Sequence, residues 1–326
     1  MNQRNIRLRE LAKEYLKEIN EPICFASVGG SVARGEADSL SDIDLTIYVN
    51  HQTDQAENVR FAGEYIQLDQ RTINEFPMEK QIATDPWTYR FLTEAYIIQD
   101  QGGTFSKRKD WVDTFYTSRQ CKEKMVKQVT EVVEDRIDFA FNCLNEEKEY
   151  SATNAAMGAW AEAAFLFQFL SSGSLSTGRL MPTIQKIDQH FHRFVNVAPF
   201  PSEIDVTEIS TIINRFRQEL KQKGASFDFG LSSIQDELAE RKSKRLIAAG
   251  EQLNLIWQTY GEALWLYFET SDGLSLEDYF STLTLESQLG LARIGFSPSN
   301  EQEIQELGRL SVELLETAKH LAKESN

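Results

Sequence analysis

The spacing of apolar and polar residues changes near residue 105. Before it, short apolar runs bounded by turn residues predict β-strands. These strands are expected at residues 23–28, 42–49, 60–69 and 95–103. Apolar positions at helical spacing predict a helix over 5–17, and Asp85-Pro86 predicts the start of another that ends near Thr93. The first 105 residues are therefore expected to mix helices and strands.

Beyond that point the apolar spacing is helical. A long amphipathic helix is expected over 125–144, and a helix that is apolar nearly all round over 152–170, capped by Ser151. Further helices are expected at 183–190, 206–222, 233–269, 276–283, 286–294 and 299–322. We therefore expect an α+β protein. A small mixed, twisted β-sheet with flanking helices would occupy residues 1–115, and an all-α helical bundle residues 116–326.

Composition narrows the class of protein. The 326 residues include 50 acidic and 34 basic ones, a net charge of −16, so a nucleic-acid partner would be repelled unless a basic groove overrides it. No apolar run approaches the roughly 20 residues that span a bilayer, and the N-terminus lacks the apolar block of a signal peptide. The 3 cysteines are widely spaced, which favours reduced thiols. We expect a cytoplasmic protein with no membrane partner. The sequence does not indicate its oligomeric state.

The strongest candidate chemistry lies where the second predicted strand begins. Asp42 and Asp44 project from one face of that strand, roughly 6–7 Å apart at Cα. At an effective dielectric of about 20 their carboxylates repel each other by roughly 2–3 kcal/mol, which a divalent cation removes. Carboxylate and phosphate oxygens together form the shell that Mg²⁺ prefers. The pair therefore predicts two Mg²⁺ ions acting on a nucleoside triphosphate.

A turn of two glycines and a serine, Gly29-Gly30-Ser31, precedes this pair. Glycines let the main chain approach a phosphate closely, and a helix that begins at Ser31 directs backbone N–H groups at it. Arg34 lies one turn further on and either reaches the same phosphates or pairs with Glu36 or Asp38. No Gly-Lys-Ser/Thr follows, so the turn is not a P-loop.

Together these residues resemble a known signature. It lies in Gly30-Ser31, Ala33-Arg34-Gly35 and Ser41-Asp42-Ile43-Asp44-Leu45. The segments are similar to those of the polymerase-β-like nucleotidyltransferase superfamily, and within it to the minimal and the antibiotic (aminoglycoside and lincosamide) nucleotidyltransferases. The resemblance covers roughly residues 20–105. It implies a mixed sheet with the aspartates on central strands, and transfer of AMP from ATP, or of another nucleoside monophosphate, to a hydroxyl of a small molecule such as an antibiotic.

That family usually has a third carboxylate on the next strand, and this chain has two candidates for it. Glu64 precedes a segment similar to the one after the third acid of the streptomycin/spectinomycin adenylyltransferases, whereas Asp69 ends the same predicted strand. Five positions apart, they point to opposite faces. Ile66 and Leu68 share the face of Glu64, so periodicity favours Asp69, while the family pattern favours Glu64. We choose Glu64 as the residue that binds metal and assists deprotonation of the acceptor hydroxyl.

The helical half has its own expected role. In related antibiotic-modifying enzymes a helical domain closes over the nucleotide, which makes Lys186 and Arg179 candidates for contacting the triphosphate, with ordinary surface cations as the alternative. Two other functions fit the same residues. One is a protein adenylyltransferase of the antitoxin type, and the other is a non-catalytic nucleotide-binding interaction protein.

Overall fold

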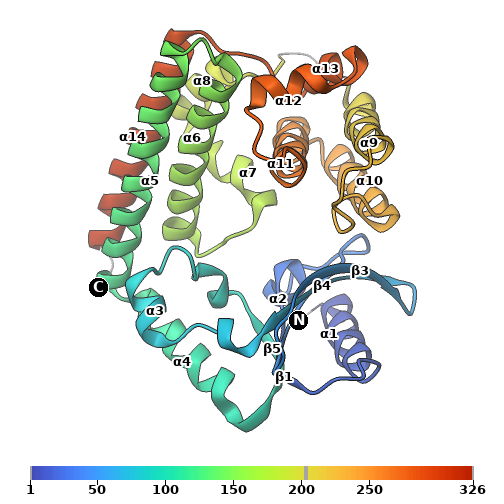
Figure 1. Ribbon diagram of the computed structural model, residues 1–326. Helices are drawn as coiled ribbons and strands as arrows, with labels where there is room; N and C mark the ends of the chain where they lie inside the picture. The colour runs from blue at the N-terminus through green and yellow to red at the C-terminus, as the bar shows by residue number, and fades with distance from the viewer. Residues whose placement is uncertain (1, 202–204, 325–326) are drawn as a thin grey trace. The chain divides into compact units, whose positions relative to one another are not determined.

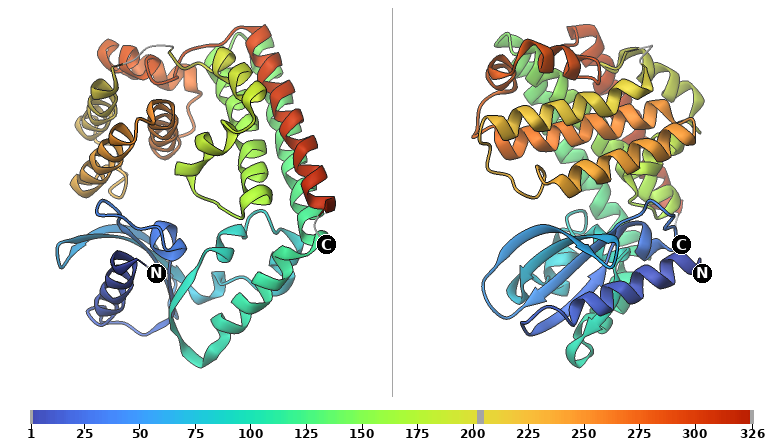
Figure 2. Two further views of the ribbon diagram at one scale, coloured as in Figure 1. Left: turned by 180° about the vertical axis from the view of Figure 1, so that it is seen from behind. Right: turned by 90° about the vertical axis from the view of Figure 1, so that its right-hand side faces the viewer.

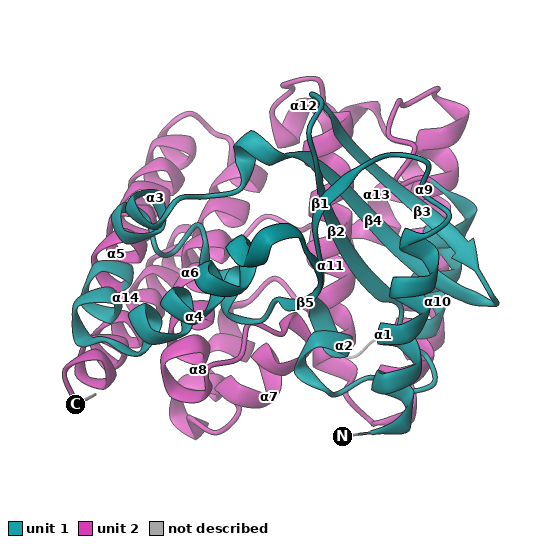
Figure 3. Cartoon of the chain, turned by 90° about the horizontal axis from the view of Figure 1, so that it is seen from below, with its two compact units in different colours: residues 1–125, 232–241, 325–326 teal, residues 126–231, 242–324 magenta. Residues whose placement is uncertain are grey.

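The computed structural model describes residues 2–201 and 205–324, which fall into two compact units (Figure 3). Of the described residues, 2–125 and 232–241 form the first unit, and 126–231 and 242–324 the second. The first unit contains the β-sheet and the second is helical, which confirms the expected α+β class. The division falls ten residues after the expected boundary at 115/116. Residues 1, 202–204 and 325–326 of the expected domains lie outside the described part.

The sheet has five strands in the order β3-β4-β2-β1-β5 (Figure 1). They are β1 Ile23–Val28, β2 Ile43–Val49, β3 Asp54–Phe61, β4 Glu64–Thr72 and β5 Tyr96–Asp100. β2 and β4 are parallel, and the other neighbouring pairs are antiparallel. In the parallel pair Asp44 lies opposite Gln67, and Thr46 lies opposite Asp69. This register decides which side chains can meet in the site.

The predictions for the two central strands are confirmed, but the strand expected at 60–69 is wrong in extent. The chain reverses at Ala62 and Gly63, whose φ values are 48° and 82°, so this stretch is divided between two strands. β3 was not predicted because its side chains are mostly exposed and carry no apolar alternation. Tertiary pairing with β4, rather than sequence pattern, makes it a strand.

The helix expected from Asp85 to Thr93 is also wrong. A helix ends there instead: α3 runs from Glu79 to Thr84 and is followed by a turn and the 3₁₀ helix η2, Arg90–Thr93. The residue before a proline is held out of the helical region, and Asp85 accordingly has φ −129° and ψ 66°. The Asp-Pro pair therefore terminates one helix rather than capping the next.

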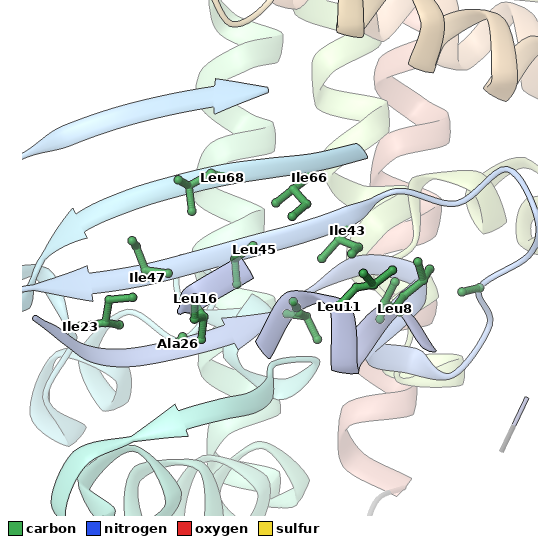
Figure 4. Packing of buried hydrophobic residues seen from close by; sticks show 14 of the residues in the cluster. Leu8, Leu11, Leu16, Ile23, Ala26, Ile43, Leu45, Ile47, Ile66 and Leu68 are labelled. Atoms are coloured by element: carbon green, nitrogen blue, oxygen red, sulfur yellow. The ribbon is translucent and has the colours of Figure 1, made fainter. Parts of the chain in front are cut away.

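Helix α1, Gln3–Leu16, covers one face of the sheet (Figure 4). It contributes Leu8, Leu11 and Leu16 to a core built with apolar side chains of the central strands. Those side chains include Ile23, Ala26, Ile43, Leu45, Ile47, Ile66 and Leu68. The other face carries an aromatic cluster of Phe25, Tyr48, Phe76 and Phe105. Apolar packing on one face thus fixes which side chains are left for the other.

Three further short elements complete the first unit. α2 (Gly30–Arg34) follows β1, η1 (Ile73–Glu75) follows β4, and η3 (Gln101–Gly103) follows β5. Gly102 and Gly103 have φ values of 79° and 72°, so the strand expected at 95–103 ends earlier, at Asp100. α4, Thr104–Thr117, then leads to α5, Arg119–Asn145, which continues into the second unit.

In the second unit α14 packs against α6 (Figures 1 and 2). The elements after α5 are α6 Glu149–Ser172, η4 Thr177–Arg179, α7 Leu180–Ile184, α8 Asp188–Val197, α9 Val206–Gln222, α10 Ser233–Ala248, α11 Gln252–Thr270, α12 Leu276–Thr282, α13 Leu285–Ala292 and α14 Glu301–Glu324. The single helix expected at 233–269 is interrupted at Gly250, whose φ of 71° ends α10. None of the helices in the described residues is long and apolar enough to cross a membrane.

Candidate functional site

The candidate site lies on the sheet face opposite α1, here called the polar face. Asp44 and Thr46 of β2 point to it, together with Gln67 and Asp69 of β4, because the register aligns them across the parallel pair. Asp42 directly precedes β2 and shares this face by strand alternation. Both aspartates of the pair are half-buried. The register places Asp44 on the polar face, and the place of Asp42 beside it stays the prediction of their spacing.

The glycine turn lies directly against this aspartate pair. The backbone N–H of Gly29 donates to the carbonyl oxygen of Asp44 at 2.8 Å. Gly30 has a φ of 56°, and a Cβ at this position would collide with Oδ2 of Asp44. Gly30 also begins α2, one residue before the expected Ser31. The close approach of main chain and carboxylate therefore requires glycine, which explains why this turn and this aspartate occur together.

Glu64 lies on the other face, under α1. Arg4 donates to both of its carboxylate oxygens, at 2.5 and 2.6 Å, and Arg7 lies 3.5 Å away. The hydrogen bonds from Arg4 hold the pKa of Glu64 below its usual range. Ile66, two positions further along the same strand, shares this face and is a core residue. The structure does not bring Glu64 to Asp42 and Asp44, because strand alternation commits it to the core side.

Asp69 is the candidate that shares the polar face with the aspartate pair. Its Oδ2 accepts hydrogen bonds from Arg71, 2.8 Å from Nε and 2.7 Å from Nη2. It lies opposite Thr46, one strand over and two positions along from Asp44. That places the two Cα atoms roughly 8 Å apart. Asp69 and Thr46 also line a pocket of about 280 Å³, together with Ser27 and Gly29.

Arg34 has carboxylate partners of its own. Its Nε lies 3.0 Å from Glu36 and its Nη1 lies 2.7 Å from Glu94. Burial opposes the charge of the guanidinium, but the two carboxylates together raise its pKa. The sequence leaves two interpretations of Arg34 open, contact with phosphates and pairing with an acid. In the structure Arg34 pairs with acids, and Glu36 is one of the expected partners.

The remaining candidates belong to the second unit. Lys186 is exposed between α7 and α8, and Arg179 is the last residue of η4. Their contact with a triphosphate stays a prediction.

Residues 232–241, mostly the start of α10, contribute to the polar face without any indication in the sequence. Their contacts are Ser232 with Asn58 at 3.0 Å, Gln235 with Gln67 at 3.0 Å, and Glu237 with Tyr65 and, at 2.7 Å, with Arg60. Gln67 is the register partner of Asp44, so this segment borders the aspartate pair. The contacts are polar and join parts of the chain that are far apart in sequence. A hydrophobic pattern indicates only which residues of a single helix or strand are buried, so it does not predict such contacts.

The donor set can be tested against the metal that the aspartates imply. Within the described ranges, no three Asp, Glu, His or Cys side chains gather closely enough to hold an ion by themselves. Mg²⁺ is usually held by one or two carboxylates together with substrate phosphates and water, rather than by a cage made wholly of protein. Two carboxylates on one face, beside a glycine turn that a phosphate can approach, fit this mode of Mg²⁺ binding.

The comparison with protein-family models agrees with the domain type. Residues 9–116 match the family model described as "Nucleotidyltransferase domain", which supports nucleotidyl transfer in general. This range includes the glycine turn, the aspartate pair and both candidates for the third carboxylate. A search of curated proteins finds no match. Among solved structures, the chain is similar to a nucleotidyltransferase-like protein from Exiguobacterium sibiricum 255-15, with 13% identity, a TM-score of 0.34 and coverage of 89% of this chain and 87% of that one.

Proposed function

We propose that this chain is a Mg²⁺-dependent nucleotidyltransferase that transfers a nucleoside monophosphate, AMP from ATP in the first instance, to a hydroxyl of a small molecule in the cytoplasm. One observation carries the proposal. The carboxylate of Asp44 lies in the space that a side chain at Gly30 would fill, so a phosphate-binding turn and a metal-binding acid occupy the same corner of the sheet.

Asp42 and Asp44 are the residues that would hold the metal, with the substrate's phosphate oxygens completing the shell. Bound Mg²⁺ stabilises the attacking and leaving oxygens of an in-line displacement. The backbone N–H groups at the start of α2 and the hydroxyl of Ser31 would donate to the β- and γ-phosphates. Gly29 and Gly30 allow the phosphates to approach the main chain.

For the third carboxylate we propose Asp69 in place of Glu64. Glu64 is held by Arg4 under α1, whereas Asp69 faces the aspartate pair's side of the sheet. In the proposed step Asp69 accepts the proton of the acceptor hydroxyl. The hydroxyl oxygen forms a bond to the α-phosphorus, the bond from that phosphorus to the bridging oxygen breaks, and pyrophosphate leaves.

The test is pyrophosphate release by the purified full chain with Mg²⁺ and each of ATP, GTP, CTP and UTP, across a panel of small alcohols and antibiotics. Mass spectrometry of the acceptor identifies the product by the added nucleoside monophosphate. The Asp44→Asn variant is the control, since it keeps the shape of the side chain and removes its charge. Turnover that survives Asp44→Asn contradicts the proposal.

Two outcomes point to the other functions that fit this site. If no small molecule is modified but a co-expressed protein gains the mass of a nucleotide, the acceptor is a protein hydroxyl. If calorimetry shows that Mg²⁺ and ATP bind without turnover in any of these assays, the chain is a nucleotide-binding interaction protein.

A further inference from the structure

We infer that the pocket beside Asp69 binds the ring that carries the accepting hydroxyl, and that the acceptor is a compact, mainly apolar ring alcohol. This inference rests on the proposed function. Of the two antibiotic classes that the sequence suggests, it departs from the aminoglycosides, because an aminoglycoside is a polycation built from several sugar rings. The pocket lies wholly within the first unit, on the polar face.

The floor of the pocket is a row of oxygen-bearing side chains from three adjacent strands. Ser27 of β1 lies opposite Thr46 of β2, which lies opposite Asp69 of β4. All three line the pocket. A hydroxyl that enters the pocket therefore meets two alcohols that can orient it, and a carboxylate that can take its proton.

Much of the remaining lining is apolar and aromatic. It includes Tyr48 and Phe105, both buried, together with Phe91, Leu92 and Ala95, while Thr88 and Tyr89 add hydroxyls. Flat rings pack well against such walls, because aromatic side chains supply a large rigid contact area. A long flexible polyol would leave many of its hydroxyls against these apolar side chains, where they lose hydration without gaining hydrogen bonds.

Size and charge exclude a polycation. The volume of about 280 Å³ lies near the lower end of ligand pockets, which suits one ring system. The charged side chains that line the pocket are Asp69, Arg71 and Glu75, and the first two are paired with each other. Glu75 also acts electrostatically on Arg71, so a multiply charged sugar would find two carboxylates that already interact with an arginine, and too little room.

Gly29 lines the same pocket, which joins it to the phosphate-binding turn. A ring seated between the aromatic walls would present its hydroxyl to the α-phosphorus of a nucleotide held at that turn. The oxygen–phosphorus bond forms as the bond to pyrophosphate breaks, and the proton passes to Asp69 and then to water. The ring itself is unchanged.

The experiment uses the full chain and three probes: benzyl alcohol, indole-3-ethanol and kanamycin. Ligand-observed NMR measures the binding of each probe, and calorimetry measures ATP with Mg²⁺. The test variant is Phe91→Ala, which removes a wall residue that is 57% exposed and so leaves the core intact. The matched control is Phe139→Ala, which removes a phenylalanine of similar exposure (55%) from α5, outside the pocket.

We expect the two ring alcohols to bind the wild type at millimolar concentration and kanamycin not to bind. Phe91→Ala should weaken the binding of the ring alcohols by about tenfold, because one aromatic contact is lost, and should leave ATP binding unchanged. Phe139→Ala should change neither the binding of the ring alcohols nor that of ATP.

Three results overturn the inference: neither alcohol binds, kanamycin binds as well as they do, or Phe91→Ala weakens ATP equally, which would make the pocket the nucleobase site. Failure of the proposed function is recognised separately, because the wild type would then release no pyrophosphate from any nucleoside triphosphate with Mg²⁺, whether or not the ring alcohols bind.

Discussion

Glu64 and Asp69 belong to one strand, yet each is bound by an arginine on a different side of the sheet. Arg4 of α1 holds both oxygens of Glu64, and Arg71 of the same strand holds Asp69. The odd separation of the two acids along β4 is the cause, since alternate residues face opposite sides. One strand therefore supplies an acid that ties down a helix and an acid that borders the candidate site.

Replacing each acid by its amide should separate these roles. Asp69→Asn should lower turnover by roughly 10²–10⁴-fold, the usual contribution of a general base. Glu64→Gln should leave the turnover of folded protein near the wild-type value. Steady-state pyrophosphate release, normalised to the folded fraction from circular dichroism, makes the comparison. The reverse pattern would return the role of third carboxylate to Glu64.

The ion pair of Arg4 and Glu64 should contribute to stability. Arg4→Met leaves the buried carboxylate without its two shortest hydrogen bonds, so we expect the free energy of unfolding to fall by about 1–3 kcal/mol. Arg7→Met is the control, because this exposed arginine lies further from Glu64, at 3.5 Å, and should cost less than about 1 kcal/mol. Urea denaturation of the three proteins measures both changes. Equal losses would show that Arg4 is not the principal partner.

Two glycines, Gly30 of the glycine turn and Gly35 at the end of α2, offer a matched test of the contact with Asp44. Gly30→Ala places a Cβ against the carboxylate of Asp44, whereas Gly35→Ala, at a φ of 80°, meets nothing within 4 Å. Both substitutions should cost about 1–2 kcal/mol of stability through left-handed backbone strain. Only Gly30→Ala should also weaken the binding of ATP with Mg²⁺ by calorimetry. Similar ATP affinity in both variants would remove the functional meaning of the contact.

Glu219 in α9 predicts how stability depends on pH. Burial alone would raise its pKa, but the contacts with Lys223 and Thr284 contribute to lowering it from 4.5 to about 2. A carboxylate whose pKa is lower in the folded state stabilises that state. The full contribution is present at a pH above the pKa of the unfolded state, and it disappears as the pH falls through the pKa of the folded state. It amounts to at most about 3 kcal/mol.

Glu219→Gln should therefore be less stable than the wild type near neutral pH, with a difference that shrinks between pH 5 and pH 2, a window set by about the unfolded and folded pKa values. Thermal denaturation across this range measures it. Glu286→Gln, at an exposed carboxylate of α13, is the control and should show little change. A difference that stays constant with pH would mean that Glu219 acts only through its shape.

The parts of the fold that the sequence predicts well are those in which burial and backbone chemistry act locally. β1 is a continuous apolar run, and the glycine turn with Asp42 and Asp44 is recognisable because each residue type is required where it stands. β3 is exposed and is a strand only through its partner β4, so no periodicity reveals it. Periodicity places Glu64 on the apolar face, and only the family pattern favours it as the third carboxylate. Its partner Arg4 lies sixty positions away and carries no signal in the sequence pattern.

The contacts of residues 232–241 have a consequence for any shortened form of this protein. A fragment that stops at residue 116, where the family match ends, would lack the stretch that hydrogen-bonds to Asn58, Gln67 and Tyr65. The part of the chain that the family model matches is thus shorter than the part that forms the contacts of the polar face. Complementing such a fragment would require the distant stretch to be supplied as a separate peptide.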